Sequence, residues 1–342
     1  MKRLIAALLL TAGPLAAQPV ITSVSPNGGP VAGGTVVTIK GSGFEACPIC
    51  SPPLPPYVAF GGTPAYSVRI VDTETLEVVT APHFPKTVGV TVDQWNGVAT
   101  TPNAFTFTGK VEDGFEQVLL PIFVPPLQGA YGSLFNTHLR LAASSSLERS
   151  WILGLTPFCA LATCVYPDPL EVPFELTPGI EQHPQDLHYT GAPGQFVFIP
   201  KMLPEPFMNL RVFDSSRDAF NFGTELPVVP LSEFTLRPIK LLGVPGDPRF
   251  RNTLRIYAEG ETSVTVVIDD MAWHLPLLGG ANALDPAYAE FTDFPAGIAS
   301  FDVTIIPSSV TPPMPGLNAP RVWAFISVTN NETQLITTIT PQ

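Results

Sequence analysis

The sequence predicts an all-β protein, in which an N-terminal immunoglobulin-like sandwich is followed by two tandem β-sandwich domains. Three observations predict this fold class. The 342 residues include 40 prolines and 27 glycines, and proline breaks helix interiors because it has no backbone N–H to donate. Apolar residues make up 45% of the chain, which is enough to build cores and argues against disorder. Apolar and polar residues alternate in many short segments, as they do in half-buried strands.

Residues 1–17 have the three parts of a secretory signal peptide. A basic start, Met1-Lys2-Arg3, is followed by the apolar run Leu4 to Leu10 and by small residues up to Ala17. This run is far shorter than the ~20 residues that a membrane-spanning helix needs, so we expect cleavage near Ala17. The expected mature protein is secreted, or held at the cell surface or in the periplasm, without a transmembrane segment.

Residues 18–109 predict the first domain. Apolar and polar side chains alternate in the segments 66–70, 88–93 and 105–108, and this period of two places one face of each strand in a core. Glycine pairs at 33–34 and 61–62 supply the positive φ of tight connections. Asn96-Gly97 is the favoured dipeptide for a two-residue hairpin turn. Short strands separated by turns over ~90 residues indicate an immunoglobulin-like sandwich.

Sequence motifs in this domain occur in a recognisable order. They are Pro19–Pro30, Gly33–Phe44, Val58–Ala65, Leu76–Pro82, Gly89–Asp93, Asn96-Gly97 and Ala104–Phe107. In this order and spacing they resemble the IPT/TIG family, a group of immunoglobulin-like (E-set) domains, over the whole domain length. The resemblance implies a binding role rather than catalysis. Domains of this kind occur in DNA-binding transcription factors and also beside polysaccharide-acting enzymes.

The segment from Glu45 to Pro56 is longer than the corresponding loop usually is in that family. It contains Cys47, Cys50 and several prolines, which stiffen a loop and lower the entropy lost on binding. The default interpretation is a decorated loop without a partner; if the segment is instead a candidate binding loop, its contacts would be Ile49, Leu54 and Tyr57.

The four cysteines form two close pairs, Cys47 with Cys50 and Cys159 with Cys164. In an oxidising compartment this spacing predicts two local disulfides. A zinc site shared by the four thiolates is an alternative, although it requires the two loops to meet. A thioredoxin-like redox role is a weaker alternative, because no helix pattern follows the first pair.

The rest of the chain predicts an internal duplication, with one sandwich at 110–235 and another at 236–342. Leu119–Ile122 and Asn136–Leu141 recur as Leu236–Ile239 and Asn252–Ile256, about 115 residues further on. This spacing suits tandem sandwiches, because solenoid repeats are ~20–50 residues long. The region also resembles the tails of other secreted bacterial IPT/TIG proteins, whose role is unknown.

Alternating segments continue to the end of the chain. Val264–Ile268 and Phe301–Ile305 have the period of half-buried strands. The last segment predicts a hairpin of Val322–Thr329 and Glu332–Thr340, joined at Asn330-Asn331.

The net charge of −12 excludes one class of partner. A nucleic-acid partner requires clustered Lys and Arg to neutralise phosphates, whereas an acidic surface mainly favours solubility. We therefore expect no nucleic acid.

Common catalytic, metal-binding and nucleotide-binding motifs are absent from the sequence. It contains no G-x-S-x-G, H-E-x-x-H, G-x-x-x-x-G-K or G-x-G-x-x-G motif. His183 and His188 are poorly spaced for metal binding, and Asp269-Asp270 is expected to close a strand and face water, or at most to add oxygens to a calcium site. We predict no catalytic site, no cofactor and no metal.

The leading hypothesis is a non-catalytic secreted or cell-surface interaction protein that acts in adhesion or envelope assembly, with a protein or a polysaccharide as partner. The alternative is a carbohydrate-binding accessory protein of a polysaccharide-processing system. Exposed tryptophans would favour that alternative, although the four tryptophans lie in or beside apolar runs that indicate core packing. A hydrolase in residues 110–342 is a third hypothesis, which would require a cleft with facing carboxylates.

Overall fold

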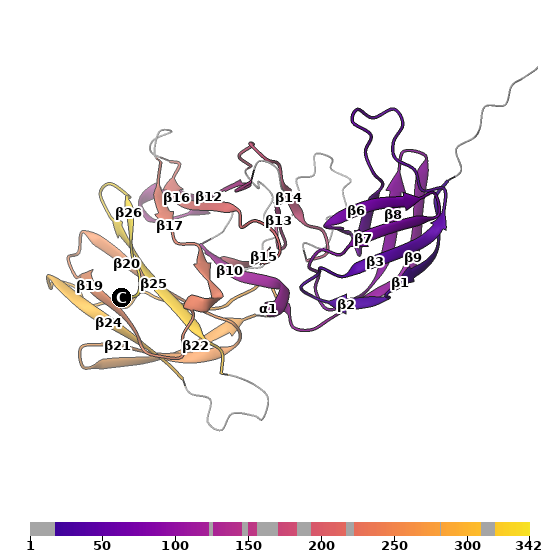
Figure 1. The fold of residues 1–342 in the computed structure, drawn as a ribbon. Helices are drawn as coiled ribbons and strands as arrows, with labels where there is room; N and C mark the ends of the chain where they lie inside the picture. The colour runs from indigo at the N-terminus through magenta and orange to yellow at the C-terminus, as the bar shows by residue number, and fades with distance from the viewer. Residues whose placement is uncertain are drawn as a thin grey trace, which may run out of the picture. The chain divides into compact units, whose positions relative to one another are not determined.

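The computed structural model describes residues 18–122, 126–145, 150–155, 170–182, 193–216, 222–280, 282–308 and 319–342. The predicted signal peptide, Cys159, Cys164, His183 and His188 lie outside these ranges. The chain divides into two compact units, Met1–Gly114 and Phe115–Gln342, which we call unit 1 and unit 2 (Figure 1). Within the described ranges, no helix is both long and apolar enough to cross a membrane.

Unit 1 is a sandwich of two sheets, as the alternating pattern predicts. One sheet has four antiparallel strands in the order β1-β3-β7-β6, and the other has five in the order β2-β9-β8-β4-β5, where β2 runs parallel to β9. The strands are β1 Val20–Ser25, β2 Gly28–Pro30, β3 Val36–Ser42, β4 Tyr57–Phe60, β5 Thr63–Pro64, β6 Ser67–Asp72, β7 Thr75–Val79, β8 Thr87–Gln94 and β9 Gly97–Thr108.

The core of unit 1 is built from every second residue of these strands. Val37, Ile39, Leu76 and Val78 come from the four-stranded sheet, and the valines of β8 and Phe105 and Phe107 of β9 come from the other. All of them are buried, because the period of two directs one face of each strand inward.

The β8–β9 hairpin differs from the prediction by one residue. Gln94 pairs with Gly97, so Trp95 and Asn96 form the turn instead of Asn96 and Gly97. The Gln94 amide explains the shift, because its Nε2 donates to Asn96 Oδ1 at 2.6 Å and to the Gly43 carbonyl at 2.7 Å. These bonds hold Asn96 within the turn.

Unit 2 contains several sheets, and its largest has eight strands in the order β19-β24-β21-β22-β23-β20-β25-β26. The smaller sheets are β15-β10-β18, β11-β12-β16-β17 and β13-β14. A short helix α1, Val111–Gly114, precedes unit 2, which also contains the 3-10 turns Ala130–Gly132 and Leu231–Glu233. The strands are β10 Phe115–Pro121, β11 Leu127–Gln128, β12 Leu134–Ala142, β13 Ser150–Ile152, β14 Phe174–Leu176, β15 Gly194–Pro200, β16 Phe207–Asp214, β17 Thr224–Leu226, β18 Val229–Pro230, β19 Ile239–Pro245, β20 Phe250–Ala258, β21 Thr262–Ile268, β22 Met271–Gly279, β23 Ala287–Phe291, β24 Ser300–Pro307, β25 Val322–Asn330 and β26 Ile336–Ile339.

Two hydrophobic cores lie on opposite faces of the β20–β25 pair. Leu254 and Ile326 belong to a core built only from residues after 238. Tyr257, Trp323 and Phe325 point to the other face and belong to a core with residues of β10, β12, β15 and β16. The β20–β25 pair is therefore buried on both sides near Tyr257.

Strand pairing is similar in the two parts of unit 2. β10 pairs with β15 as β19 pairs with β24, and β12-β16-β17 corresponds to β20-β25-β26. The register corresponds as well, since Leu139 faces Leu210 and Leu254 faces Ile326. The duplication and its division between residues 235 and 236 remain a proposal, for which this correspondence is the structural argument.

The final hairpin has a longer loop than predicted. Thr329 pairs with Ile336, so β26 begins four residues later than expected and Asn330-Asn331 is not the whole turn. Asn330 Oδ1 accepts the backbone N–H groups of Glu332 and Thr333 at 2.9 and 3.0 Å. This side chain supports a wider loop, in which Gln334 has a φ of 59°.

Candidate functional site

The predicted binding loop of unit 1 is closed by a disulfide between Cys47 and Cys50. Its base is held in place, because the Cys47 N–H donates to the Leu54 carbonyl at 2.9 Å and the buried Phe44 donates through its N–H to Thr73 at 3.0 Å. The exposed fractions are 86% for Ile49, 55% for Leu54 and 42% for Tyr57. The loop therefore presents its apolar side chains to solvent on an anchored backbone.

The β8–β9 hairpin lies beside this loop. Tyr57 of β4 pairs with Asp93 of β8, which pairs with Val98 of β9, so the three exposed side chains share one face of the sheet. Gln94 links the hairpin to the start of the loop, because its Nε2 donates to the Gly43 carbonyl at 2.7 Å and its Oε1 accepts the Glu45 N–H at 3.4 Å. We call Ile49, Leu54, Tyr57, Trp95 and Val98 the loop-end surface.

The four tryptophans lie in different environments. Trp151 and Trp323 are buried at 3% exposure, and Trp273 is half-buried with its ring 5.1 Å from that of Phe291. Core packing, which the sequence indicated for all four, is wrong for Trp95, because this residue forms the hairpin turn and is 42% exposed. The turn carries its side chain out of the sheet.

Acidic residues of unit 2 lie in an exposed turn and in an ion pair. Asp269 and Asp270 form the exposed two-residue turn between β21 and β22, as expected. Glu259 is held by Arg321, whose Nη2 and Nε donate to it at 2.7 and 3.0 Å. Among the residues described by the structure, no three His, Cys, Asp or Glu side chains are close enough to hold a metal.

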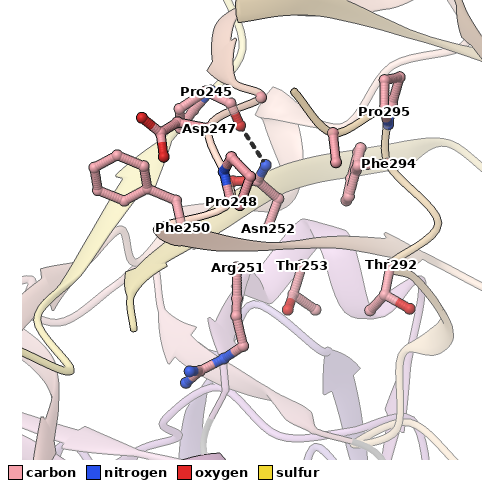
Figure 2. A pocket seen from close by; sticks show the side chains of 12 residues that line it. Pro245, Asp247, Pro248, Phe250, Arg251, Asn252, Thr253, Thr292, Phe294 and Pro295 are labelled. Carbon is pink, nitrogen blue, oxygen red and sulfur yellow. Dashed lines mark hydrogen bonds between the residues drawn. The ribbon is translucent and has the colours of Figure 1, made fainter. Parts of the chain in front are cut away.

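Two cavities in the described part of unit 2 were not predicted from the sequence. One, of about 260 Å³, lies where the β19–β20 connection meets the segment after β23, with Phe250 and Phe294 in its wall (Figure 2). Asn252 donates through Nδ2 to the Pro245 carbonyl at 2.7 Å. Its buried Oδ1 has no hydrogen-bond partner among the described residues.

The other cavity, of about 280 Å³, lies on the opposite face of β20, and we call it the arginine cavity. Arg251, Thr253 and Arg255 line it from β20, while Phe135 and Val212 line it from β12 and β16. The sequence held one signal for it, namely the alternation of Arg251, Thr253 and Arg255 with apolar Leu254 and Ile256. Which strands would cover this polar face depends on tertiary structure, and no local pattern reveals it.

Comparison with known families agrees with the geometry of unit 1. Residues 19–108 match the model of the IPT/TIG domain. This stretch is an IPT/TIG domain. The match includes the nine strands that the structure describes in residues 18–114, and the long loop that carries Ile49 and Leu54 lies within it. A search of curated proteins gave no match.

Several solved structures show a distant likeness. An auxiliary nutrient binding protein from Bacteroides thetaiotaomicron is 14% identical, with a TM-score of 0.22 over 36% of this chain and 27% of its own. The gamma-CGTase of the alkalophilic Bacillus clarkii is 16% identical, with a TM-score of 0.23 over 64% and 26%. SGBP-B from a xyloglucan utilization locus in Bacteroides uniformis is 11% identical, with a TM-score of 0.21 over 95% and 70%. The chain thus spans about a quarter of the length of the first two structures, and likeness at this level assigns no function.

Proposed function

We propose that the protein is a non-catalytic extracytoplasmic binding protein whose IPT/TIG domain binds a protein partner through the loop-end surface. The observation that carries this proposal is the exposure of Ile49, Leu54, Tyr57, Trp95 and Val98 on two linked segments of one domain. A single exposed apolar residue needs no explanation, but a group of them marks an interaction site.

The composition of the surface favours a protein partner over a polysaccharide. Trp and Tyr are enriched among the residues that dominate protein–protein binding energy, and Trp95 and Tyr57 supply one of each. Ile49 and Leu54 are aliphatic, so they have no π-face on which a sugar ring can stack, whereas they fill apolar pockets of a protein well. Their high exposure leaves most of their apolar area available for burial in a complex.

The fixed backbone of the loop favours binding, because little conformational entropy remains to be lost on association. The Cys47–Cys50 disulfide and the Cys47-to-Leu54 hydrogen bond fix the loop before any partner arrives. Preorganisation of this kind raises affinity by lowering the entropy lost on association. It also fits a protein that folds in an oxidising compartment, in agreement with the signal peptide expected at residues 1–17.

Carbohydrate binding is the second candidate function. Trp95 favours it, because an exposed indole beside the polar Asp93 and Asn96 provides a stacking face together with hydrogen-bonding groups. In that case Trp95 and Tyr57 would carry the affinity, while Ile49 and Leu54 would contribute little. This difference separates the two candidates.

Photo-crosslinking tests the proposal. A benzophenone amino acid replaces Ile49 or Trp95 in the protein expressed in its own cells, and the matched control carries it at Val71, an apolar residue of β6 that is 48% exposed. We expect one discrete protein adduct from positions 49 and 95 and none from position 71. Equal adducts at all three positions, or none, would refute a protein-binding role of this surface.

A second arm of the experiment addresses carbohydrate. The purified protein is passed over immobilised polysaccharides, and retained protein is compared among the wild type, Trp95→Ala and Ile49→Ser. Retention that is lost in Trp95→Ala but kept in Ile49→Ser would move the assignment to carbohydrate binding. A self-adduct in the crosslinking arm would identify a second copy of the chain as the partner.

A further inference from the structure

The polar face of the arginine cavity results from the alternation of side chains along β20. Leu254 and Ile256 point into the core shared with β24 and β25, so Arg251, Thr253 and Arg255 must point to the other face. Figure 2 shows this directly for Arg251 and Thr253, which leave the strand on the side opposite Asn252.

Neighbouring strands extend this polar face. Arg251 pairs with Thr329 and Thr253 with Ser327 across the β20–β25 ladder. Ser327 and Thr329 are buried, at 5% and 8% exposure, and they line the same cavity as the two arginines. Hydroxyl groups that are removed from bulk water in this way need hydrogen-bond partners.

Both arginines line the cavity, and neither forms a salt bridge with a carboxylate of the described residues. Arg251 donates to the neutral amides of Asn331 and Gln334 at 2.8 and 2.9 Å, and its guanidinium carbon lies 5.4 Å from the centre of the Tyr131 ring. Arg255 donates through Nη1 to the Ser327 hydroxyl, while its buried Nε has no hydrogen-bond partner among the described residues. No carboxylate of the described residues lies within 4.0 Å of either group.

Burial makes the Arg251 cation costly. Desolvation lowers the pKa of Arg251 below its ordinary value, while the neighbouring Tyr131 acts in the opposite direction. A partly buried cation loses hydration, and Arg251 is compensated only by two neutral amides and the Tyr131 ring. An anion in the cavity would supply Coulombic attraction, and a guanidinium presents a fork of N–H donors that matches a planar carboxylate.

Glu290 limits the kind of anion. It pairs with Arg255 across the β20–β23 ladder and lines the cavity, and its Oε2 accepts a hydrogen bond from the Tyr288 hydroxyl at 2.7 Å. Its negative charge opposes a dianion such as phosphate. A ligand hydroxyl, by contrast, can donate to its carboxylate.

We propose that the arginine cavity binds a sugar acid, meaning a single uronate unit, either free or at the end of a chain. The uronate carboxylate binds Arg255, and its ring hydroxyls bind Glu290, Ser327 and Thr253. The cavity of about 280 Å³ lies at the lower limit of the ~300–1,000 Å³ typical of small-molecule sites, so it suits one ring rather than an oligosaccharide. The proposal is independent of the proposed function, because the loop-end surface belongs to unit 1.

Titration calorimetry on the full-length protein tests this site. The probes are glucuronate and galacturonate, with glucose, galactose, acetate and inorganic phosphate as comparisons. We expect millimolar or tighter binding of at least one uronate, and much weaker binding of its neutral sugar and of acetate. A ligand that binds only the folded state also raises the melting temperature as its concentration rises. No uronate binding by the wild type, or equal binding of acetate or phosphate, would overturn the proposal.

Two substitutions locate the site. Arg255→Gln removes the charge, and we expect affinity for the uronate to fall about tenfold or more. The matched control is Arg237→Gln, an exposed arginine of the same unit that does not line the cavity, and its affinity should equal that of the wild type. If Arg255→Gln does not fold, Ser327→Ala tests the same contact and should also weaken binding. Equal loss in Arg237→Gln, or full affinity in Ser327→Ala and Arg255→Gln, would place the ligand elsewhere.

Discussion

The hydroxyl of Tyr257 donates a hydrogen bond of 2.7 Å to the carbonyl oxygen of Pro193. Tyr257 lies on β20, in the second part of unit 2, whereas Pro193 directly precedes β15 in the first part. The ring is fully buried and packs in the core that β20 and β25 share with β10 and β12. One side chain thus contributes both apolar area and a polar bond to the contact between the two parts.

Tyr257→Phe should therefore lower the stability of unit 2. The substitution keeps the ring but removes the bond to Pro193 and the weaker one, of 3.4 Å, that the Ile122 N–H donates to the hydroxyl. Ile122 still reaches the Pro193 carbonyl at 3.2 Å, so we expect a loss of about 1 kcal/mol. For a unit of this size the melting temperature should fall by about 2–4 °C. Tyr66→Phe, at an exposed tyrosine of unit 1, serves as the control and should leave it unchanged.

The same tyrosine predicts a loss of stability at alkaline pH. Burial raises the pKa of Tyr257 above its ordinary value, and burial followed by the neighbouring Tyr257 raises the pKa of Tyr288. Tyrosines of the unfolded chain ionise near pH 10, so above that pH the folded state retains protons that the unfolded state has lost. Stability is therefore complete below about pH 10 and decreases as pH rises further.

Denaturant unfolding between pH 8 and about pH 11.5 measures this effect. The slope of unfolding free energy against pH should be shallower for Tyr257→Phe than for the wild type, because one of the two perturbed groups is gone. Identical slopes would show that Tyr257 is not the group responsible.

Local pattern predicted much of the fold. The period of two along β8, β9, β21 and β24 identified their buried faces, since the inward positions of a strand follow directly from sequence. Turn details were less predictable. The β8–β9 turn shifted by one residue because the Gln94 side chain, which is distant from Gly43 in sequence, bonds to its carbonyl. Such a contact exists only after the sandwich has formed.

The sites were predictable to different extents. Composition singled out Ile49, Leu54 and Tyr57, because proline, cysteine and exposed apolar residues are local features of one loop, although their binding role remains a prediction. The arginine cavity was not predicted, because Arg255 and Ser327 lie 72 residues apart and meet only through the β20–β25 ladder. Trp95 was expected in a core, because sequence alone did not show that the turn includes it.

Gly41→Ala should destabilise the IPT/TIG domain. A Cβ at this position would lie 1.8 Å from the Val20 carbonyl oxygen and 2.6 Å from the Phe44 ring. The first atom belongs to the backbone of β1, so the β1–β3 pairing must open to accept the methyl group. We expect a loss of about 2–3 kcal/mol, as for overpacked cores.

Gly34→Ala is the matched control, because its Cβ meets nothing within 4 Å. Because Gly34 has a φ of 77°, an alanine at this position strains only the backbone, and we expect a loss of stability of about 1 kcal/mol. Urea unfolding of both variants distinguishes these effects, and equal losses would contradict the steric account.

Removal of the Cys47–Cys50 disulfide should affect binding more than stability. The two cysteines are three residues apart, and closing so short a loop removes little entropy from the unfolded chain, so we expect a loss of about 2 kcal/mol at most. The Cys47 N–H still donates to the Leu54 carbonyl in Cys47→Ser/Cys50→Ser, which keeps the base of the loop attached to the sheet.

The conformation of the exposed tip that carries Ile49 is fixed by the disulfide itself. Without it, the tip must be ordered when the partner binds, and that entropy is subtracted from the affinity. The crosslinking yield from position 49 should therefore fall in the double serine variant, while the yield from position 95, which lies on the β8–β9 hairpin, should change less. Comparison of the two yields at matched protein concentration provides the measurement. Unchanged yield at position 49 would mean that the loop needs no disulfide to present its apolar side chains.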